Sequence, residues 1–322
     1  MNPTGALPQA DFKSGLFKLK FRAMGTVCQV AYTSGSLPEA EDFRGAVLDF
    51  VRTFEKRYSR YDPDSLVSAI NQAAGSHPVE ITAEDSTMFD LCASLHFITD
   101  GVFDPTALPL ATLWDFRARK SAPSPGAIQE AVKKVGWSRV ERTPDSLFLP
   151  EEGMALDLGG FGKEYAVDRV AGMARDTGIS SALVDFGGDV FAVGHHPDAD
   201  SWRVGVEDFK YPGKPFCLLG VGDLAVATSG NYLRSFESDG RLYGHIIDHR
   251  RGYPACDTPA SATVVSGSCT EAGVLATCAI IEGPHAGLSR IEGVYGAEGC
   301  FRETESLYTT NHFSNHAYND EN

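Results

Sequence analysis

The stretch Ala155-Leu-Asp-Leu-Gly-Gly-Phe-Gly-Lys-Glu-Tyr-Ala-Val-Asp168 organises the sequence around it. A short apolar strand that carries Asp157 is expected to run into a glycine-rich turn, and Lys163–Arg175 then shows apolar residues at helical spacing. A strand, a glycine turn and a helix start together form an anion-binding geometry, because the first N–H groups of a helix lack partners within it. We therefore expect a site for a phosphate-bearing cofactor here.

Two common phosphate motifs do not explain this part of the chain. A Walker A loop needs a glycine six positions before its lysine and a hydroxyl residue after it, whereas Asp157 precedes Lys163 and Glu164 follows it. Gly220-Val-Gly-Asp-Leu-Ala225 matches the spacing G-x-G-x-x-A, but the residues after it indicate no helix that could receive a pyrophosphate. We attribute that second match to chance.

The overall charge excludes one class of partner. The chain has 322 residues, enough for one large domain or two interlocked lobes. Its 28 basic and 43 acidic residues give a formal net charge of -15. Such a charge would repel a nucleic-acid backbone and an anionic membrane surface, so we expect no nucleic acid as a partner.

The ends and the cysteines indicate a cellular location. The first residues show neither the basic region nor the apolar region of a signal peptide, and no run approaches the ~20 apolar residues of a membrane span. The seven cysteines are odd in number and form no C-x-x-C pair, which is typical of small core residues in a reducing compartment. We expect a cytoplasmic protein without membrane insertion, provided that no leader precedes this sequence.

Apolar spacing predicts both helices and strands. In the first half we expect a strand pair bent at Met24-Gly25-Thr26, then helices and a hairpin, over Phe17–Met24, Thr26–Tyr32, Pro38–Tyr58, Leu66–Gln72 capped by Ser65, Ala83–Thr99, Pro125–Val135 and Val140–Leu149. The second half is expected to be mostly β, with a late helix, over Ser181–Gly194, Trp202–Glu207, Leu218–Thr228 and Cys269–Ile281. Glycines inside the first of these runs suggest a bulge or a close approach by another group.

Three positions in the first half are candidates for ligand contact. Tyr61, in the turn after the long helix, either packs on the protein or stacks on a flat ligand. Asp104 precedes Pro105, where extended backbone would fix its carboxylate, although an Asp-Pro turn is the simpler interpretation. Met24, at the bend of the strand pair, is typical of core packing.

His245 and His249 have the spacing H-x-x-x-H, which on a helix could bind a metal. The two isoleucines between them and the turn Arg251-Gly-Tyr-Pro254 instead indicate a strand end, where this spacing does not converge on a metal. His245 is better explained as a single proton acceptor, because an ordinary histidine pKa of ~6.5 suits general-base catalysis near neutrality.

Eight short segments, taken in order, carry a family resemblance. They are Ala23-Met-Gly-Thr26, Tyr58-Ser-Arg-Tyr-Asp-Pro-Asp-Ser65, Gly101-Val-Phe-Asp-Pro-Thr106 with Leu113-Trp114, Asp157-Leu-Gly-Gly-Phe-Gly-Lys163 with Tyr165-Ala-Val-Asp168, Asp185-Phe-Gly-Gly-Asp189, Thr228-Ser-Gly-Asn-Tyr232, His245-Ile-Ile-Asp248 and Leu275-Ala-Thr277. With them the chain resembles the ApbE-like flavin transferases, the FAD:protein FMN transferases, over nearly its whole length. The resemblance implies an α+β, T-fold-like mixed architecture with largely antiparallel sheets and packed helices. It implies a single domain over 17–302, between a flexible lead-in at 1–16 and a polar tail at 303–322.

The resemblance also implies a reaction. Members of this family bind FAD and transfer its FMN portion to a Ser or Thr hydroxyl of an acceptor flavoprotein, releasing AMP. Such phosphoryl transfer needs a held pyrophosphate, a cation that offsets developing charge, and a base for the attacking hydroxyl. Matched position by position, the family pattern assigns the essential histidine to His245. It assigns FAD contacts to Met24, Tyr61, Phe103, Asp104, Pro105, Asp157, Lys163 and Ile247, of which Lys163 would complement phosphate charge.

The magnesium site is where this sequence departs from the family pattern. The family usually presents Asp-Ala-Leu-Ala-Thr, with Asp and Thr as ligands beside a backbone carbonyl of the glycine turn, but this chain has Gly273-Val-Leu-Ala-Thr277. The resemblance therefore leaves the Gly160 carbonyl and Thr277 as Mg²⁺ ligands, without the usual carboxylate. Glu271 could replace that carboxylate only if the backbone took a different course. Glu164, where the family commonly has Gly, adds negative charge beside the phosphates.

Two other functions stay open at this point. An FAD pyrophosphatase would use water as the nucleophile and release FMN and AMP without an acceptor. A flavin-binding protein, with catalysis weakened because Gly273 replaces the Asp, would bind FAD without releasing AMP.

Overall fold

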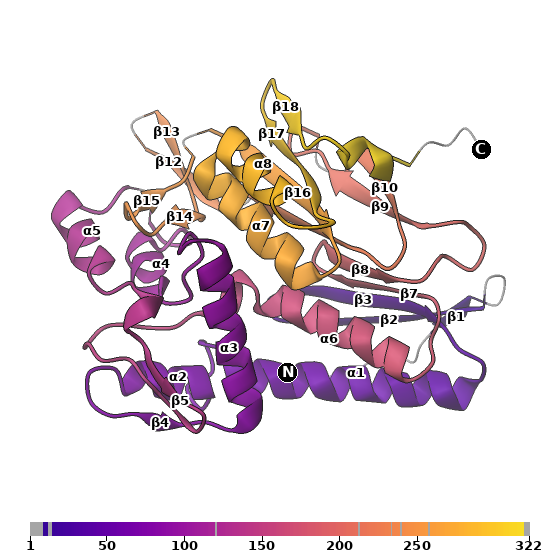
Figure 1. Ribbon diagram of the computed structural model, residues 1–322, viewed down its shortest axis with the longest axis horizontal. Helices are drawn as coiled ribbons and strands as arrows, with labels where there is room; N and C mark the ends of the chain where they lie inside the picture. The colour runs from indigo at the N-terminus through magenta and orange to yellow at the C-terminus, as the bar shows by residue number, and fades with distance from the viewer. Residues whose placement is uncertain are drawn as a thin grey trace.

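An antiparallel sheet of nine strands forms the centre of the molecule (Figure 1). The computed structural model describes residues 9–11, 15–119, 121–211, 213–232, 234–238, 240–256 and 258–318. Every pair of neighbouring strands in this sheet is antiparallel. In spatial order the strands are β1 (Gln9–Asp11), β2 (Leu16–Ala23), β3 (Thr26–Thr33), β7 (Ala182–Phe186), β8 (Asp189–Val193), β11 (Ala225–Gly230), β16 (Ala260–Ser266), β17 (Glu298–Glu303) and β18 (Leu307–Thr309). The predicted α+β fold with largely antiparallel sheets and packed helices is confirmed.

Layers on both faces bury the middle of this sheet. Helices α6 (Gly162–Asp176), α7 (Cys269–Glu282) and α8 (Pro284–Glu292) lie across one face, and the long α1 (Leu37–Tyr58) runs beside them (Figure 1). A hairpin of β9 (Trp202–Glu207) and β10 (Pro215–Val221) contributes to a second core on strands β8, β11 and β16. Strands β8 and β16 are buried at every position, as expected for strands covered on both faces.

Shorter elements gather at one end of the large sheet (Figure 1). Two of the three strand pairs of the described residues, and a three-stranded sheet in the order β4-β6-β5, belong to this end. The elements of this end are α2 (Leu66–Gln72), β4 (Val79–Glu80), α3 (Ala83–Ile98), α4 (Leu108–Trp114), α5 (Pro125–Val132), η1 (Trp137–Arg139), β5 (Glu141–Thr143), β6 (Ser146–Phe148), β12 (Ser235–Ser238), β13 (Arg241–Gly244), β14 (Ile247–Asp248) and β15 (Tyr253–Pro254).

Side-chain caps explain why several predicted helices begin where they do. Ser65 accepts a hydrogen bond from the backbone N–H of Ser68, which confirms it as the cap of α2. Thr82 and Asp85 form a capping box at the start of α3, each bonding the other's backbone N–H. The predicted helices at α1, α2, α3 and α7 are confirmed, and α5 is shorter than predicted because it ends at Val132.

Two other local predictions were wrong, and a third was right in part. The strand expected before the glycine turn is only a single parallel bridge between Ala107 and Ala155. Leu218–Thr228 is not one strand, because a turn with Asp223 at φ 53° separates β10 from β11. The glycine interruption after β7 is a tight hairpin turn at Gly187-Gly188, both at positive φ, and it is also a close approach, because a Cβ on Gly187 would lie 2.3 Å from the hydroxyl oxygen of Thr26.

The two ends of the chain are partly described. Of the expected lead-in at 1–16, residues 1–8 and 12–14 lie outside the described residues, while β1 pairs with β2. The expected tail at 303–322 contains β18 and a 3-10 turn, η3 (Phe313–His316), in which Phe313 is buried. Residues 319–322 lie outside the described residues.

All seven cysteines are free thiols, and five of them are fully buried. Burial raises the pKa of Cys28 and that of Cys278 to about 12, so both thiols stay protonated at neutral pH. The prediction that the cysteines are small core residues is confirmed for these buried ones. Among the described residues, no helix combines the length and the apolar character needed to cross a membrane.

Candidate functional site

The glycine turn is one turn of 3-10 helix, η2 (Leu158–Gly160), that leads directly into α6. Asp157 caps it, because its Oδ1 accepts a hydrogen bond from Gly159 N at 2.9 Å. The N–H of Asp157 donates to the carbonyl of Pro105, also at 2.9 Å. No side chain of the described residues caps α6, so its first N–H groups face the turn without a side-chain acceptor.

Arg60 links two residues that the family pattern assigns to FAD. Its Nε lies 2.9 Å from Asp157 Oδ2, and its guanidinium carbon lies 4.2 Å from the ring centre of Tyr61. The Tyr61 hydroxyl also accepts a hydrogen bond from Arg60, at 2.7 Å. Tyr61 is 67% exposed, so it does not pack in the core. Sequence reasoning missed Arg60, although it stands inside the segment Tyr58–Ser65 that carries part of the resemblance.

Lys163 lies between two carboxylates at the start of α6. Its ammonium forms an ion pair with Asp189 and lies 3.5 Å from Glu164 Oε1. Asp189, at the start of β8, also accepts a hydrogen bond from Thr228 N of β11, at 3.2 Å. The lysine is therefore surrounded by more negative than positive charge, which sequence reasoning did not reveal because Asp189 comes from a distant strand.

Glu164 and Gly273 occupy facing positions on α6 and α7. A Cβ atom built on Gly273 would lie 2.6 Å from Glu164 Cγ, closer than real contacts allow. Thr277 stands one helical turn after Gly273, and its hydroxyl lies 2.8 Å from the hydroxyl of Ser229 on β11.

These contacts close into a ring. Its members, joined by side-chain contacts or by adjacency in the chain, are in order Gly273, Glu164, Lys163, Asp189, Thr228, Ser229 and Thr277. We call this set the α6–α7 ring. It brings two predicted residues, Lys163 and Thr277, to the same region as the glycine turn, because α6 follows that turn directly.

The loop Gly101–Thr106 is held by its own carboxylate. Asp104 accepts hydrogen bonds from Thr106 N, Thr106 Oγ1 and Trp137 N, at 2.8, 2.5 and 2.9 Å. Because these protein donors occupy a buried carboxylate, Asp104 fixes the loop. Its assigned FAD contact, like that of Pro105, stays a prediction.

Phe103 in the same loop is positioned by two neighbours. Its ring packs edge-on against Phe161, with ring centres 5.7 Å apart. A Cβ atom on Gly160 would lie 3.2 Å from this ring, so the glycine permits the close approach of the loop to the turn. The structure therefore brings Phe103 to the glycine turn, while its assigned FAD contact and the role of the Gly160 carbonyl stay predictions.

Met24 lies at the tip of the β2–β3 hairpin. Both turn residues have positive φ, 50° at Met24 and 73° at Gly25, as a type I′ turn requires. The N–H of Met24 donates to Glu55 Oε1 at 2.8 Å. Its side chain is half-buried and packs on the core, which agrees with the simpler interpretation made from the sequence. A non-glycine residue in this backbone region is uncommon, so the position is held by its surroundings.

His245 has one ring nitrogen without a partner. Its Nδ1 is buried and has no hydrogen-bond partner in the described part of the chain, while its backbone N–H donates to Arg234 O at 2.9 Å. Burial, and then the positive charge of Arg234, lower the pKa of His245 to about 4. The ring is therefore neutral at pH 7 and able to accept a proton. Ile247, which follows it in β14, pairs with Pro254 of β15.

His249 contacts the backbone of a neighbouring loop. Its Nε2 donates to the carbonyl of Gly101 at 2.7 Å, which ties the β14–β15 turn to the loop Gly101–Thr106. Within the described ranges, no three or more His, Cys, Asp or Glu side chains gather as they would around a metal ion. The interpretation of the histidine pair as a strand end is confirmed by β14 and β15.

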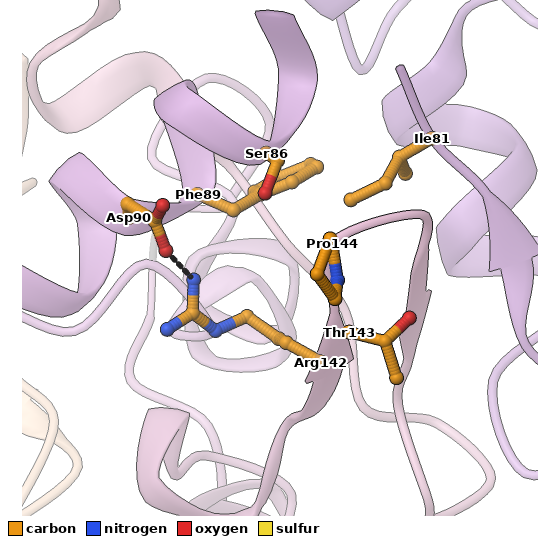
Figure 2. Close-up of a pocket in the computed structure, with 7 residues that line it drawn as sticks. All are labelled: Ile81, Ser86, Phe89, Asp90, Arg142, Thr143 and Pro144. Atoms are coloured by element: carbon orange, nitrogen blue, oxygen red, sulfur yellow. Dashed lines mark hydrogen bonds and ion pairs between the residues drawn. The ribbon is translucent and has the colours of Figure 1, made fainter. Parts of the chain in front are cut away.

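A cavity of about 220 Å³ lies away from these residues (Figure 2). It is lined by Phe89 and Asp90 of α3 and by Arg142 and its neighbours, and Asp90 Oδ1 lies 2.8 Å from Arg142 Nη1. Its volume is below the ~300–1,000 Å³ typical of ligand pockets, and none of the predicted FAD contacts lines it. We therefore place the candidate site at the glycine turn and the α6–α7 ring.

Comparisons with known proteins agree with this geometry. The family model described as "ApbE family" matches residues 24–301. A relative named FAD:protein FMN transferase, from Treponema pallidum (strain Nichols), is 30% identical over 299 residues, which cover 86% of this chain and 82% of that protein. The crystal structure of the ApbE protein from Thermotoga maritima is 27% identical, with a TM-score of 0.85, and covers 94% of this chain and 100% of that one. A histidine-to-glycine mutant of the flavin transferase ApbE from Vibrio cholerae is 26% identical, with a TM-score of 0.82 and coverages of 94% and 99%. The chain belongs to the ApbE family.

Proposed function

We propose that this protein is an FAD:protein FMN transferase, an enzyme that moves FMN from FAD to a Ser or Thr hydroxyl of an acceptor flavoprotein and releases AMP. The observation that carries the proposal is the α6–α7 ring beside an uncapped helix start. It places a lysine next to helix N–H groups that can bind an anion, and it gathers carboxylates and hydroxyls that suit a cation. The relative named FAD:protein FMN transferase and the structure named flavin transferase support the same reaction.

The start of α6 suits the pyrophosphate of FAD. Its first N–H groups have no side-chain acceptor, and Lys163 adds an ammonium beside them. Because Lys163 pairs with Asp189 and Glu164, we expect the phosphates to compete with these carboxylates for the ammonium. Arg60, which contacts both Tyr61 and Asp157, would hold the exposed aromatic ring at the flavin end of the site.

His245 is the proposed base. The acceptor hydroxyl oxygen bonds to the phosphorus of the FMN half, the bond from that phosphorus to the bridging oxygen breaks, and AMP leaves with its electron pair. The hydroxyl proton passes to the neutral imidazole of His245. Since its pKa is about 4 in the free protein, the negative phosphates of bound FAD would strengthen this base by raising that pKa.

The residues of the α6–α7 ring also fit a divalent cation. Glu164 Oε2 is a buried carboxylate oxygen without a hydrogen-bond partner among the described residues, and the Thr277 hydroxyl is a second oxygen donor. Glu271 instead accepts a hydrogen bond from Ser266 in the first turn of α7. Magnesium, held by Thr277 and by the Gly160 carbonyl that the resemblance names, would offset the charge of the phosphates when bound.

The test is a transfer assay on the full chain. We expect FAD, MgCl₂ and a flavoprotein subunit with a Ser or Thr acceptor to give protein-bound FMN and one AMP for each transfer, seen as flavin fluorescence on a denaturing gel. His245→Asn should lower the rate by about 10²–10⁴-fold, the usual contribution of a general base. An exposed histidine gives the control, His77→Asn, which should keep the wild-type rate.

The same assay separates the two other functions. Free FMN and AMP formed at the same rate without an acceptor would identify an FAD pyrophosphatase instead. Tight FAD binding without AMP release, under any divalent cation, would identify a flavin-binding protein. The seven free cysteines favour the reducing cytoplasm, which we propose as the location.

A further inference from the structure

One carboxylate oxygen beside the glycine turn lacks a hydrogen-bond partner. Glu164 Oε2 is buried, and no hydrogen-bond donor of the described residues reaches it. The other oxygen, Oε1, lies 3.5 Å from Lys163 Nζ, but that ammonium already forms an ion pair with Asp189. Burying a carboxylate oxygen without a partner is costly, so such an atom in a native fold points to a further positive group.

The position of Glu164 depends on a missing side chain. A Cβ atom on Gly273 would lie 2.6 Å from Glu164 Cγ and 3.1 Å from its Cδ. The glutamate of α6 therefore fills the volume that a side chain from α7 would need. The two departures from the family pattern, at 164 and at 273, are thus one exchange between two packed helices.

The neighbours of this carboxylate are oxygen atoms of the kind a hard cation takes. Thr277 stands one turn beyond Gly273 on α7, and its hydroxyl lies 2.8 Å from the Ser229 hydroxyl. Divalent cations such as Mg²⁺ and Mn²⁺ prefer carboxylate and other oxygen ligands. Two carboxylates, from Glu164 and Asp189, face the single ammonium of Lys163, so the ring carries an unbalanced negative charge.

We infer that Glu164 is the anionic ligand of a divalent cation held between α6 and α7, where it supplies from α6 the carboxylate that Gly273 cannot supply from α7. Thr277 would be a second ligand. The inference rests on the proposed function and deepens it, since it names the residue that replaces the absent aspartate. The competing role is that of a second counter-ion for Lys163, without any cation.

Binding of Mn²⁺ alone to the full chain tests this inference without any turnover. Free Mn²⁺, followed by electron paramagnetic resonance, should show one site in the wild type and at least ~tenfold weaker binding in Glu164→Gln, which keeps the shape of the side chain. Asp176→Asn, at the exposed far end of α6, is the matched control and should bind as the wild type does. Circular dichroism would confirm that each variant is folded.

A second pair of variants tests the exchange itself. Glu164→Gly should bind Mn²⁺ as weakly as Glu164→Gln, and adding Gly273→Asp to it should restore binding to within a few-fold of the wild type. Equal affinity in wild type and Glu164→Gln, or no Mn²⁺ site in the wild type, overturns the inference. If Mn²⁺ binding depends on Glu164 but no FMN is transferred, the inference stands and the proposed function fails. If FMN is transferred but the Mn²⁺ affinity does not depend on Glu164, the proposed function stands and the inference fails.

Discussion

Asp168 of α6 accepts hydrogen bonds from both the backbone N–H and the hydroxyl of Thr270 in α7, at 2.8 and 2.7 Å. The same carboxylate also accepts hydrogen bonds from the hydroxyl of Ser268 and the N–H of Cys269, so it caps the first turn of α7. A carboxylate at this end of a helix also complements the helix dipole. This contact fixes the position of α7 along α6, and with it the geometry of the α6–α7 ring.

Asp168→Asn should therefore destabilise the protein by about 2 kcal/mol or more, because charged hydrogen bonds and the dipole interaction are lost together. Urea unfolding monitored by circular dichroism would measure the change in the free energy of unfolding. Asp176→Asn, on the same helix but exposed, should stay within about 0.5 kcal/mol of the wild type. Equal stabilities of the two variants would show that the capping contact contributes nothing.

The effect of Gly273→Ala on the free energy of unfolding should change sign when the side chain of Glu164 is removed. In the wild type it should destabilise by about 1–3 kcal/mol, because the new Cβ meets Glu164 Cγ at 2.6 Å. In a Glu164→Ala background it should stabilise by about 1 kcal/mol, because alanine is the better helix former. Urea unfolding of all four proteins gives the coupling energy. Gly172→Ala is the control and should stabilise the protein in both backgrounds, because its Cβ meets nothing within 4 Å. A stability effect of Gly273→Ala with the same sign in both backgrounds would contradict the contact between position 273 and Glu164.

The parts of the fold that the sequence predicted well are those determined locally. Helix α2 begins at its Ser65 cap, and α1 and α3 show long apolar stripes, so their bounds were nearly right. Helix α4 was missed because it has seven residues, a proline in its first turn and no side-chain cap. Its apolar residues pack on distant elements, as when Trp114 Nε1 donates to Gly252 O, and periodicity over one turn does not show this.

In the candidate site, too, the sequence identified residues within local motifs but not the contacts between residues far apart in the chain. Motif order was enough to name Lys163 and Thr277, whose segments lie in the ring. The ion pair of Lys163 with Asp189 was not predictable, because strand pairing brings Asp189 to it from a distant part of the chain. Likewise, Glu164 and Gly273 look like two unrelated departures until the packing of α6 on α7 joins them.

Arg60→Gln is expected to weaken FAD binding about tenfold. The substitution removes the ion pair with Asp157 and the stacking on Tyr61, and the loss of one charged hydrogen bond is worth about 1.5–3 kcal/mol before the site relaxes. Quenching of flavin fluorescence would measure the dissociation constant. Arg52→Gln breaks an exposed pair with Asp49 on α1 and serves as the control, with unchanged affinity expected. Equal affinities would exclude Arg60 from the FAD site.

Asp85 should make the protein sensitive to acid. Burial raises the pKa of this carboxyl, but hydrogen bonds from Arg57 and Thr82 outweigh burial and bring the pKa to about 2. Because the folded pKa lies below the ordinary aspartate value of 3.8, the stabilisation is present above pH ~4 and is lost as pH falls toward 2. Asp85→Asn should be less stable at pH 7 and should lose less stability across this window, as urea unfolding at several pH values would show. Parallel curves for variant and wild type would contradict it.

His245 should titrate with a pKa of about 4 in the folded protein without flavin, because burial and then the charge of Arg234 disfavour the imidazolium. In the unfolded chain its pKa returns to ~6.5. The unfolded state therefore binds the proton first as pH falls, so this contribution to stability is complete above pH ~6.5 and disappears by pH ~4. His245→Asn should lose less free energy of unfolding between these values than the wild type, while His77→Asn, at an exposed position, should follow the wild-type curve. Proton resonances of the imidazole give the direct check, and a midpoint near 6.5 for His245 would show that its ring is solvated rather than buried beside Arg234.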